Sequence, residues 1–180
     1  MNDREGDLGA LHAWLQSAAE RGALAVVCGA NGDMDTVASA VGLAAAWPQA
    51  MACGRHLGRL AKRMVEEEGA PFRKMTRPTS WPVALGGIVV VDAAAPSQVD
   101  LDLPEGVPLC IIDHHDTHGW DLARDDLSLR WNVSATTEIV AASSSTCWCI
   151  CCISSAGIGV YLKAINAPTN PETNPTIKTT

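Results

Sequence analysis

Three groups of carboxylate and imidazole side chains each directly follow a short apolar run of the sequence. In chain order, these side chains are Asp33 and Asp35, then Asp92, and then Asp113, His114 and His115. If the apolar runs are neighbouring parallel strands of an α/β sheet, their carboxyl ends share one edge, and the three groups converge there. Several carboxylates in a small space repel one another unless a divalent cation compensates their charge. The sequence therefore predicts a metal-dependent enzyme.

Each group taken alone also has a plainer structural interpretation. Asp33 and Asp35 are two residues apart, so an extended backbone would send both side chains the same way, but they could equally be a turn acid and a helix N-cap. We assign the cap to Asp35 in that case, because a helical run follows it. Asp92 could simply end a strand at a turn, and His114 and His115 could be ordinary loop histidines. The occurrence of all three groups, each after a predicted strand, favours the functional interpretation.

The elements that must position these side chains alternate between strand and helix patterns. Apolar runs predict strands, and apolar residues at helical spacing predict helices. The predicted strands are residues 23–28, 50–53, 86–91 and 108–112, and the predicted helices are residues 7–20, 36–47 and 56–68. Residues 70–82 contain three prolines and few apolar residues, so we expect a loop there. Strands separated by helices favour parallel pairing with right-handed crossovers, so we predict an α/β fold with a Rossmann-like parallel sheet flanked by helices.

The character of the sequence changes after Asp126. No Asp follows this residue, no His follows His118, and no Arg follows Arg130. The last residues are rich in Pro, Thr and Asn without apolar periodicity, which is typical of a poorly structured tail. We interpret residues 1–142 as a single, truncated catalytic domain. Residues 143–180 are then either an atypical tail or an ending encoded in a changed reading frame.

Four of the seven cysteines are packed between residues 147 and 152. Cys149 and Cys152 form a C-x-x-C pair, but no second pair and no His follow, which disfavours a zinc site. Residues 139–162 are uncharged and long enough to span a bilayer, yet their Ser and Thr residues make a membrane segment a weak alternative. The other three cysteines occur singly in apolar or turn contexts, and we expect reduced, buried thiols at Cys28, Cys53 and Cys110.

The charge balance limits the partners of the chain. A net charge of −7 argues against a general affinity for the nucleic-acid backbone, although a local site could still bind phosphates. The basic residues of the predicted helix 56–68 lie largely on one side, which could contact a phosphate but more commonly forms a solvated face. The first residues lack the basic segment and apolar run of a signal peptide, so we expect a cytoplasmic protein without a membrane partner.

The ordered set of motifs resembles the DHH phosphoesterase superfamily. Residues 28–40, which read Cys-Gly-Ala-Asn-Gly-Asp-Met-Asp-Thr-Val-Ala-Ser-Ala, resemble the first motif of that family, and Asp92 resembles the second. Asp113-His114-His115 is similar to the signature that names the family. Residues 135–140 are similar to the helix start that follows in many members. The resemblance covers about residues 20 to 142 of the chain.

This resemblance implies hydrolysis of a phosphodiester or phosphoanhydride bond of a nucleotide, an oligonucleotide or a related substrate. It implies two Mn²⁺ ions, with Mg²⁺ as the other candidate, since Asp and His ligands without thiolate suit these ions. Asp33 would bind one ion, Asp35 and His114 would bind the other, and Asp92 would bridge both. Two such ions can activate a water molecule and neutralise charge that grows on the phosphoryl oxygens.

Two residues of the signature would then act on the substrate rather than on the ions. His115 would face the scissile phosphate, and Asp113 would orient the histidine pair. The implied partner is a phosphate-containing small molecule or a short single-stranded oligonucleotide, and the oligomeric state is left open. The chain departs from the family pattern at Gly29, where the family has a His, and it lacks the family's further Asp and second domain after Asp126. The alternative function is a catalytically impaired remnant that binds a nucleotide or a partner.

Overall fold

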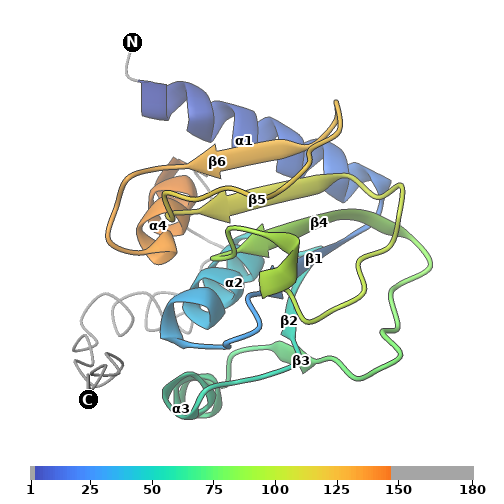
Figure 1. The fold of residues 1–180 in the computed structure, drawn as a ribbon, viewed down its shortest axis with the longest axis vertical. Helices are drawn as coiled ribbons and strands as arrows, with labels where there is room; N and C mark the ends of the chain where they lie inside the picture. The colour runs from blue at the N-terminus through green and yellow to red at the C-terminus, as the bar shows by residue number, and fades with distance from the viewer. Residues whose placement is uncertain (1–2, 147–180) are drawn as a thin grey trace, which may run out of the picture.

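All six strands in the computed structural model, which describes residues 3–146, pair in parallel (Figure 1). The strand order across the sheet is β3-β2-β1-β4-β5-β6. The strands are β1 (Ala23–Cys28), β2 (Ala50–Gly54), β3 (Phe72–Lys74), β4 (Leu85–Val91), β5 (Leu109–Asp113) and β6 (Leu127–Arg130). The order reverses between β1 and β4, and the ends of two such strands are where α/β sheets place their ligands. Asp33 follows β1 and Asp92 follows β4, so this edge of the sheet positions the candidate site.

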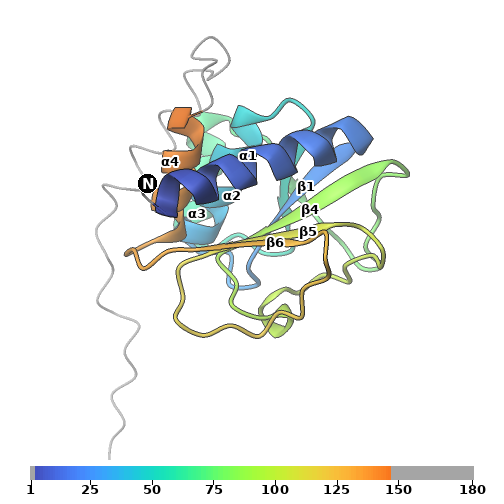
Figure 2. The same ribbon diagram turned by 90° about the horizontal axis from the view of Figure 1, so that it is seen from above.

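All four α-helices of the described residues cover one face of the sheet (Figure 2). They are α1 (Asp3–Arg21), α2 (Met34–Ala46), α3 (Arg59–Glu68) and α4 (Thr136–Thr146). Buried apolar residues from all four helices share one core with one side of the strands, as Leu11, Val37, Met64 and Ile139 illustrate. The helical face is therefore the larger of the two cores.

The second face of the sheet is covered by loops. Right-handed crossovers explain this arrangement, because the chain runs from β1 to β3 in one direction along the sheet and from β4 to β6 in the other. Residues 92–108, before β5, and residues 114–126, after it, therefore cross on the face opposite to α2 and α3. They form one short 3₁₀ helix, η1 (Pro96–Gln98), and no α-helix. The buried Trp120 closes this layer, and its Nε1 donates a hydrogen bond of 2.8 Å to the carbonyl of Ala93.

The predicted fold class is confirmed: the structure is an α/β domain with a parallel sheet flanked by helices. The two edge strands, β3 and β6, were not predicted from the sequence. Residues 70–82 were expected to be a loop, which is wrong for β3, a three-residue strand in which Arg73 and Lys74 are exposed. β6 was not expected, because it offers only two leucines in the sequence Leu-Ser-Leu-Arg. Short edge strands bury too little apolar surface to leave an apolar run in the sequence.

The basic side chains of α3 are largely paired with acids of the same helix. Lys62 lies 3.7 Å from Glu66, and Arg63 lies 2.6 Å from Glu67, both at the spacing of one helical turn. These four side chains are well exposed, so the pairs contribute little to stability. The structure therefore agrees with a solvated face on this part of α3.

Several predictions fall on the C-terminal part of the chain. Cys149, Cys152 and residues 147–162 of the uncharged segment lie outside the described residues, as does the rest of the tail, so these interpretations stay predictions. Within residues 3–146, none of the helices has the length and apolar character needed to cross a membrane. The expectation of free, buried thiols is confirmed for the three single cysteines, Cys28, Cys53 and Cys110.

Gly86 tests the close packing of β4 against the end of α1. A Cβ atom at Gly86 would lie 2.1 Å from the carbonyl oxygen of Ala18, so an alanine there must displace backbone. We expect Gly86→Ala to lower the free energy of unfolding by about 2 kcal/mol or more, measured by urea denaturation. Gly9→Ala is the control, because no atom lies within 4 Å of its Cβ position in α1, and it should stabilise by roughly 0.5–1 kcal/mol. A Gly86→Ala variant as stable as the wild type would contradict this packing.

Candidate active site

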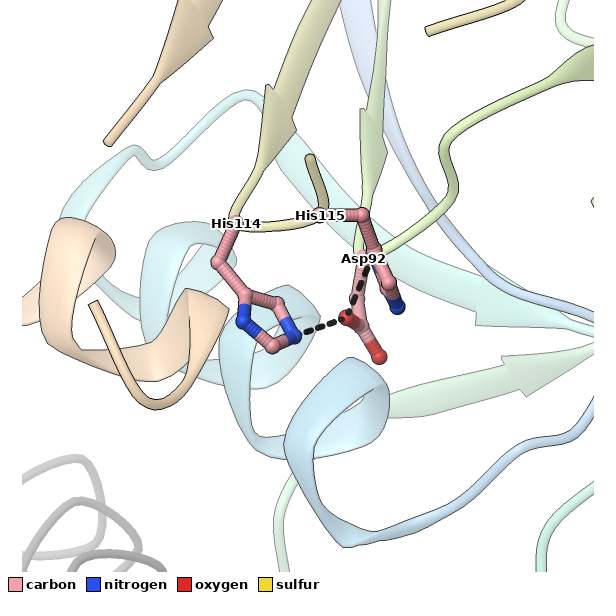
Figure 3. Close-up of side chains that lie close together, drawn as sticks. All are labelled: Asp92, His114 and His115. Carbon is pink, nitrogen blue, oxygen red and sulfur yellow. Dashed lines mark ion pairs between the residues drawn. The ribbon is translucent and has the colours of Figure 1, made fainter. Parts of the chain in front are cut away.

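Asp92 lies at the centre of the candidate site (Figure 3). It directly follows β4, and it is the one non-glycine residue with a positive φ, 58°, among residues 3–146. Its side chain is only 5 % exposed, and its Oδ1 accepts a hydrogen bond of 3.2 Å from the hydroxyl of Thr136. Burial, followed by the negative charges of Asp35 and Asp33, raises the pKa of Asp92 to about 7. The folded chain therefore holds a carboxylate that is costly to ionise without a compensating cation.

His114 presents a ring nitrogen to two carboxylates. Its Nε2 lies 3.4 Å from Oδ1 of Asp92 (Figure 3). The same nitrogen lies 3.9 Å from Oδ2 of Asp35. Its Nδ1 lies 3.3 Å from the carbonyl of Val133, and because a carbonyl can only accept, Nδ1 carries the proton of this hydrogen bond. In the neutral ring the Nε2 lone pair then faces the two carboxylate oxygens. This donor set fits a divalent cation, with a carbonyl fixing the tautomer of the histidine ligand.

His115 is oriented by a different partner. Its Nδ1 lies 2.7 Å from Oδ1 of Asp113, whose side chain is fully buried at the end of β5. The hydrogen bond to Asp113 raises the pKa of His115. Since Nδ1 is occupied, Nε2 is the ring nitrogen left for a substrate. Asp113 thus contacts His115, whereas His114 is fixed by Val133.

The two acids of the first group are each bound to a helix N-terminus. Asp33 is the N-cap of α2, with Oδ1 accepting from the backbone N–H of Thr36 at 3.1 Å and Oδ2 accepting from Asn31 at 2.6 Å. Asp35 lies in the first turn of α2, and its carboxylate accepts the backbone N–H groups of Thr136 at 2.8 Å and Thr137 at 2.9 Å at the start of α4. Both acids therefore satisfy N–H groups that a helix leaves unpaired.

This geometry corrects the sequence interpretation of the two acids. The N-cap of α2 is Asp33, not Asp35, because the helix begins at Met34. For the same reason, Asp33 and Asp35 do not lie on one extended segment, and their side chains do not point the same way. They reach the site from a cap position and from a helical turn, which direct them to different partners.

The structure brings most of the six predicted site residues together. Asp92, His114 and His115 each offer a ligand atom, and these atoms lie within 4.8 Å of one another. Asp35 approaches His114, and Asp113 joins the group through His115. We favour Asp35 over His115 as the third ligand of an ion, because Nδ1 of His115 is already hydrogen-bonded. The sixth residue, Asp33, is bonded to Asn31 and Thr36, and its charge contributes to the raised pKa of Asp92.

Sequence reasoning missed several residues that support this group. Arg130, at the end of β6, donates hydrogen bonds to the carbonyls of His115 and Thr117 and so holds the loop that carries the histidines. Gln98 accepts from Ala30 at 2.7 Å through its backbone carbonyl, which ties η1 to the loop after β1. The threonine pair at the start of α4 carried a usable signal, since hydroxyl residues before an apolar helical run mark a helix N-terminus. Arg130 carried none, because β6 itself was not expected.

Comparison with protein families gives one match. Residues 24–176 match the family described as DHH family, N-terminal domain. The matched span contains all six predicted site residues and extends past residue 142, the predicted end of the catalytic domain. No curated protein matches the chain by sequence.

Solved structures with the same fold include two phosphate-related proteins. One is an exopolyphosphatase-related protein from Bacteroides fragilis, with a TM-score of 0.67 and 15% identity over 94% of this chain and 53% of that chain. The other is a putative family II inorganic pyrophosphatase from Methanococcus jannaschii, with a TM-score of 0.55 and 21% identity over 79% of this chain and 47% of that chain. At these identities the likeness shows the fold alone. The chain spans about half the length of each of these proteins.

The burial of the Asp92 carboxylate predicts how the stability of the fold changes with pH. Its pKa is about 7 in the folded chain against 3.8 for a free carboxyl, so the unfolded chain ionises first as the pH rises through this interval, and the folded chain loses stability. Asp92→Asn removes the charge but keeps an acceptor for Thr136 and tolerates the left-handed backbone. Without divalent ions, we expect the variant to be more stable than the wild type by roughly 1–3 kcal/mol at about pH 8 and equally stable below about pH 4.

Urea denaturation at the two pH values, in the presence of a chelator, measures this difference. Asp116→Asn is the matched control, because Asp116 is exposed and lies next to the histidine pair. A wild type as stable as Asp92→Asn at the higher pH would show that the Asp92 carboxylate costs the fold nothing.

Proposed function

The chain belongs to the DHH family, and on that premise we propose that it is a phosphoesterase that hydrolyses a phosphodiester or phosphoanhydride bond with a divalent cation. The observation that carries the proposal is the approach of Nε2 of His114 to the carboxylates of Asp92 and Asp35. The lone pair of a neutral imidazole facing two acids is unfavourable unless a proton or a metal ion lies between them, and a divalent cation can bind all three side chains at once. Asp92 directly follows β4, His114 directly follows β5, and Asp35 lies in the first turn of α2. The fold therefore brings these three side chains together.

The residues that would hold the cation are Asp35, Asp92 and His114, with Asp33 as the predicted ligand of a further ion. A bound divalent cation neutralises charge on phosphoryl oxygens and lowers the pKa of a water molecule. Oxygen and imidazole donors without a thiolate suit Mn²⁺, which we propose as the native ion, and Mg²⁺ is the next choice. The raised pKa of Asp92 supports this assignment, because cation binding relieves the cost of its ionised form.

His115 would supply the proton that hydrolysis requires. As the oxygen of a water molecule forms a bond to phosphorus, the bond to the leaving oxygen breaks and places negative charge on that oxygen. The proton that the leaving oxygen takes up would come from Nε2 of the protonated His115 ring. The hydrogen bond from Nδ1 to Asp113 keeps the ring oriented and favours its protonated form. Asp113 is therefore a positioning residue for His115, while the side chain of His115, 41 % exposed, is open to a substrate.

The substrate we propose is a phosphate-containing small molecule or a short single-stranded oligonucleotide. The net charge of −7 supports a small or short substrate, because a long nucleic acid would be repelled by most of the surface. Proteins named as exopolyphosphatase-related and as a pyrophosphatase share the fold, which makes a phosphoanhydride a reasonable substrate class. The predicted cytoplasmic location belongs to the same proposal.

Hydrolysis of bis-p-nitrophenyl phosphate and of inorganic pyrophosphate by the purified chain with Mn²⁺ tests this function. We expect His115→Gln to lower kcat for pyrophosphate by about 100-fold or more, because it removes the proton donor, and to slow bis-p-nitrophenyl phosphate less, because p-nitrophenolate leaves without a proton. In the wild type, kcat should fall as the pH rises through the pKa of His115. In His115→Gln this fall of kcat at high pH should disappear. Asp92→Ala should abolish turnover together with cation binding.

His118→Gln is the control, since His118 is an exposed histidine three residues from His115. It should keep the wild-type rate. Turnover that survives in both Asp92→Ala and His115→Gln would disprove the assignment of this site. Cation binding without turnover of either substrate would instead indicate a binding module.

A further inference from the structure

The ligand atoms around Asp92 are distributed unevenly between its two neighbouring strands. Toward β5, His114 presents Nε2 at 3.4 Å from Asp92 and 3.9 Å from Asp35, and the carbonyl of Val133 fixes its tautomer. Toward β1, the loop of residues 29–33 contains a single ionisable side chain, Asp33. One side therefore offers an imidazole and two carboxylates, whereas the other offers only the carboxylates of Asp33 and Asp92.

Asp33 is already engaged as a structural group. One of its oxygens accepts the N–H of Thr36, and the other accepts the side-chain amide of Asn31. Each carboxylate oxygen has a further lone pair, so Asp33 can still bind an ion while it caps α2. The same holds for Asp35, whose carboxylate accepts hydrogen bonds from Thr136 and Thr137, so the two sides differ in the imidazole of His114 rather than in the hydrogen bonds of their acids.

Gly29 itself adds no ligand on the β1 side. A Cβ atom at this position would lie 2.9 Å from the carbonyl oxygen of Asp92 and 3.3 Å from Oδ1 of Asn31. The N–H of Gly29 donates to the hydroxyl of Thr36, which in turn donates to the carbonyl of Val91. The loop is thus packed at position 29 against the end of β4 without space for a side chain there, and this packing includes the backbone of Asp92 itself.

The two sides therefore differ in what they can hold before a substrate is present. Mg²⁺ and similar ions need about six ligands, and a site with one or two carboxylates commonly completes its set with waters and substrate phosphates. The β5 side offers three protein ligands of two chemical types. The β1 side offers the carboxylates of Asp33 and Asp92 without an imidazole and depends on phosphate and water for the rest.

We infer that the substrate-free chain holds one divalent ion, on Asp35, Asp92 and His114, and that a second ion binds beside Asp33 only together with a phosphate ligand. This inference rests on the proposed function and specifies the order in which the site assembles. The first ion is resident. The second ion is delivered with the substrate, so phosphate binding and completion of the site are one event.

Isothermal titration of the full chain with MnCl₂, in buffer without phosphate, measures the number of resident ions. We expect one Mn²⁺ per chain, and a second one when methylenediphosphonate, a diphosphate analogue that resists hydrolysis, is present. Electron paramagnetic resonance gives an independent readout, because one isolated Mn²⁺ and a coupled pair have different spectra. Neither readout requires catalytic turnover.

Two variants assign the ions to their ligands. His114→Gln should weaken the resident ion by about tenfold or more, because it removes the imidazole ligand. Asp33→Asn should leave the affinity of the resident ion within about threefold and remove the second ion seen with methylenediphosphonate, since it still caps α2. Asp116→Asn, an exposed acid outside the site, should change neither ion.

The outcomes separate this inference from the proposed function. Two Mn²⁺ ions in the absence of any phosphate compound would overturn the inference and leave the proposed function intact. A single resident ion that is lost in Asp33→Asn but kept in His114→Gln would overturn the assignment of its ligands. A chain that binds no Mn²⁺ under either condition would overturn the proposed function itself.

Discussion

The carboxylate of Asp35 joins the two helices on which the site depends. It belongs to the first turn of α2 and accepts the backbone N–H groups of Thr136 and Thr137, which lie 101 and 102 residues away at the start of α4. These N–H groups have no partner within their own helix, so the contact fixes where α4 begins. The hydroxyl of Thr136 then reaches Asp92. One acid thereby links α2, α4 and, through Thr136, the central carboxylate of the site.

The sheet topology explains why this linkage is possible. The strand order reverses between β1 and β4, so the segments that leave these strands pass to opposite faces. On one face, α2 carries Asp33 and Asp35 to the edge. On the other, the loop after Asp92 is held by Trp120 at Ala93 and by Gln98 at Ala30. The acids of the site thus come from segments anchored in two separate cores, which leaves each of them little freedom to move.

The sequence was sufficient for the central strands and for the residues that end them. The apolar runs before Asp92 and Asp113 belong to strands buried on both faces, so both strand ends could be placed from composition alone. The roles of Asp33 and Asp35 could not be separated, because a loop acid and a helix cap differ by the one or two residues at which a helix begins. The threonines of α4 were identified as part of a helix start, but their contacts with Asp35 and Asp92 were missed, as was Arg130, because these partners are more than ten residues away in sequence and depend on packing.

The contrast between Asp35 and Asp92 has an evolutionary consequence. Asp35 satisfies the N-terminus of α4, so purifying selection on folding alone would retain it even in a lineage that had lost its chemistry. Asp92 is a buried, poorly compensated acid on a left-handed backbone, and it works against the stability of the ion-free fold. Without selection for ligand binding, a substitution of Asp92 would therefore be tolerated more readily than a substitution of Asp35.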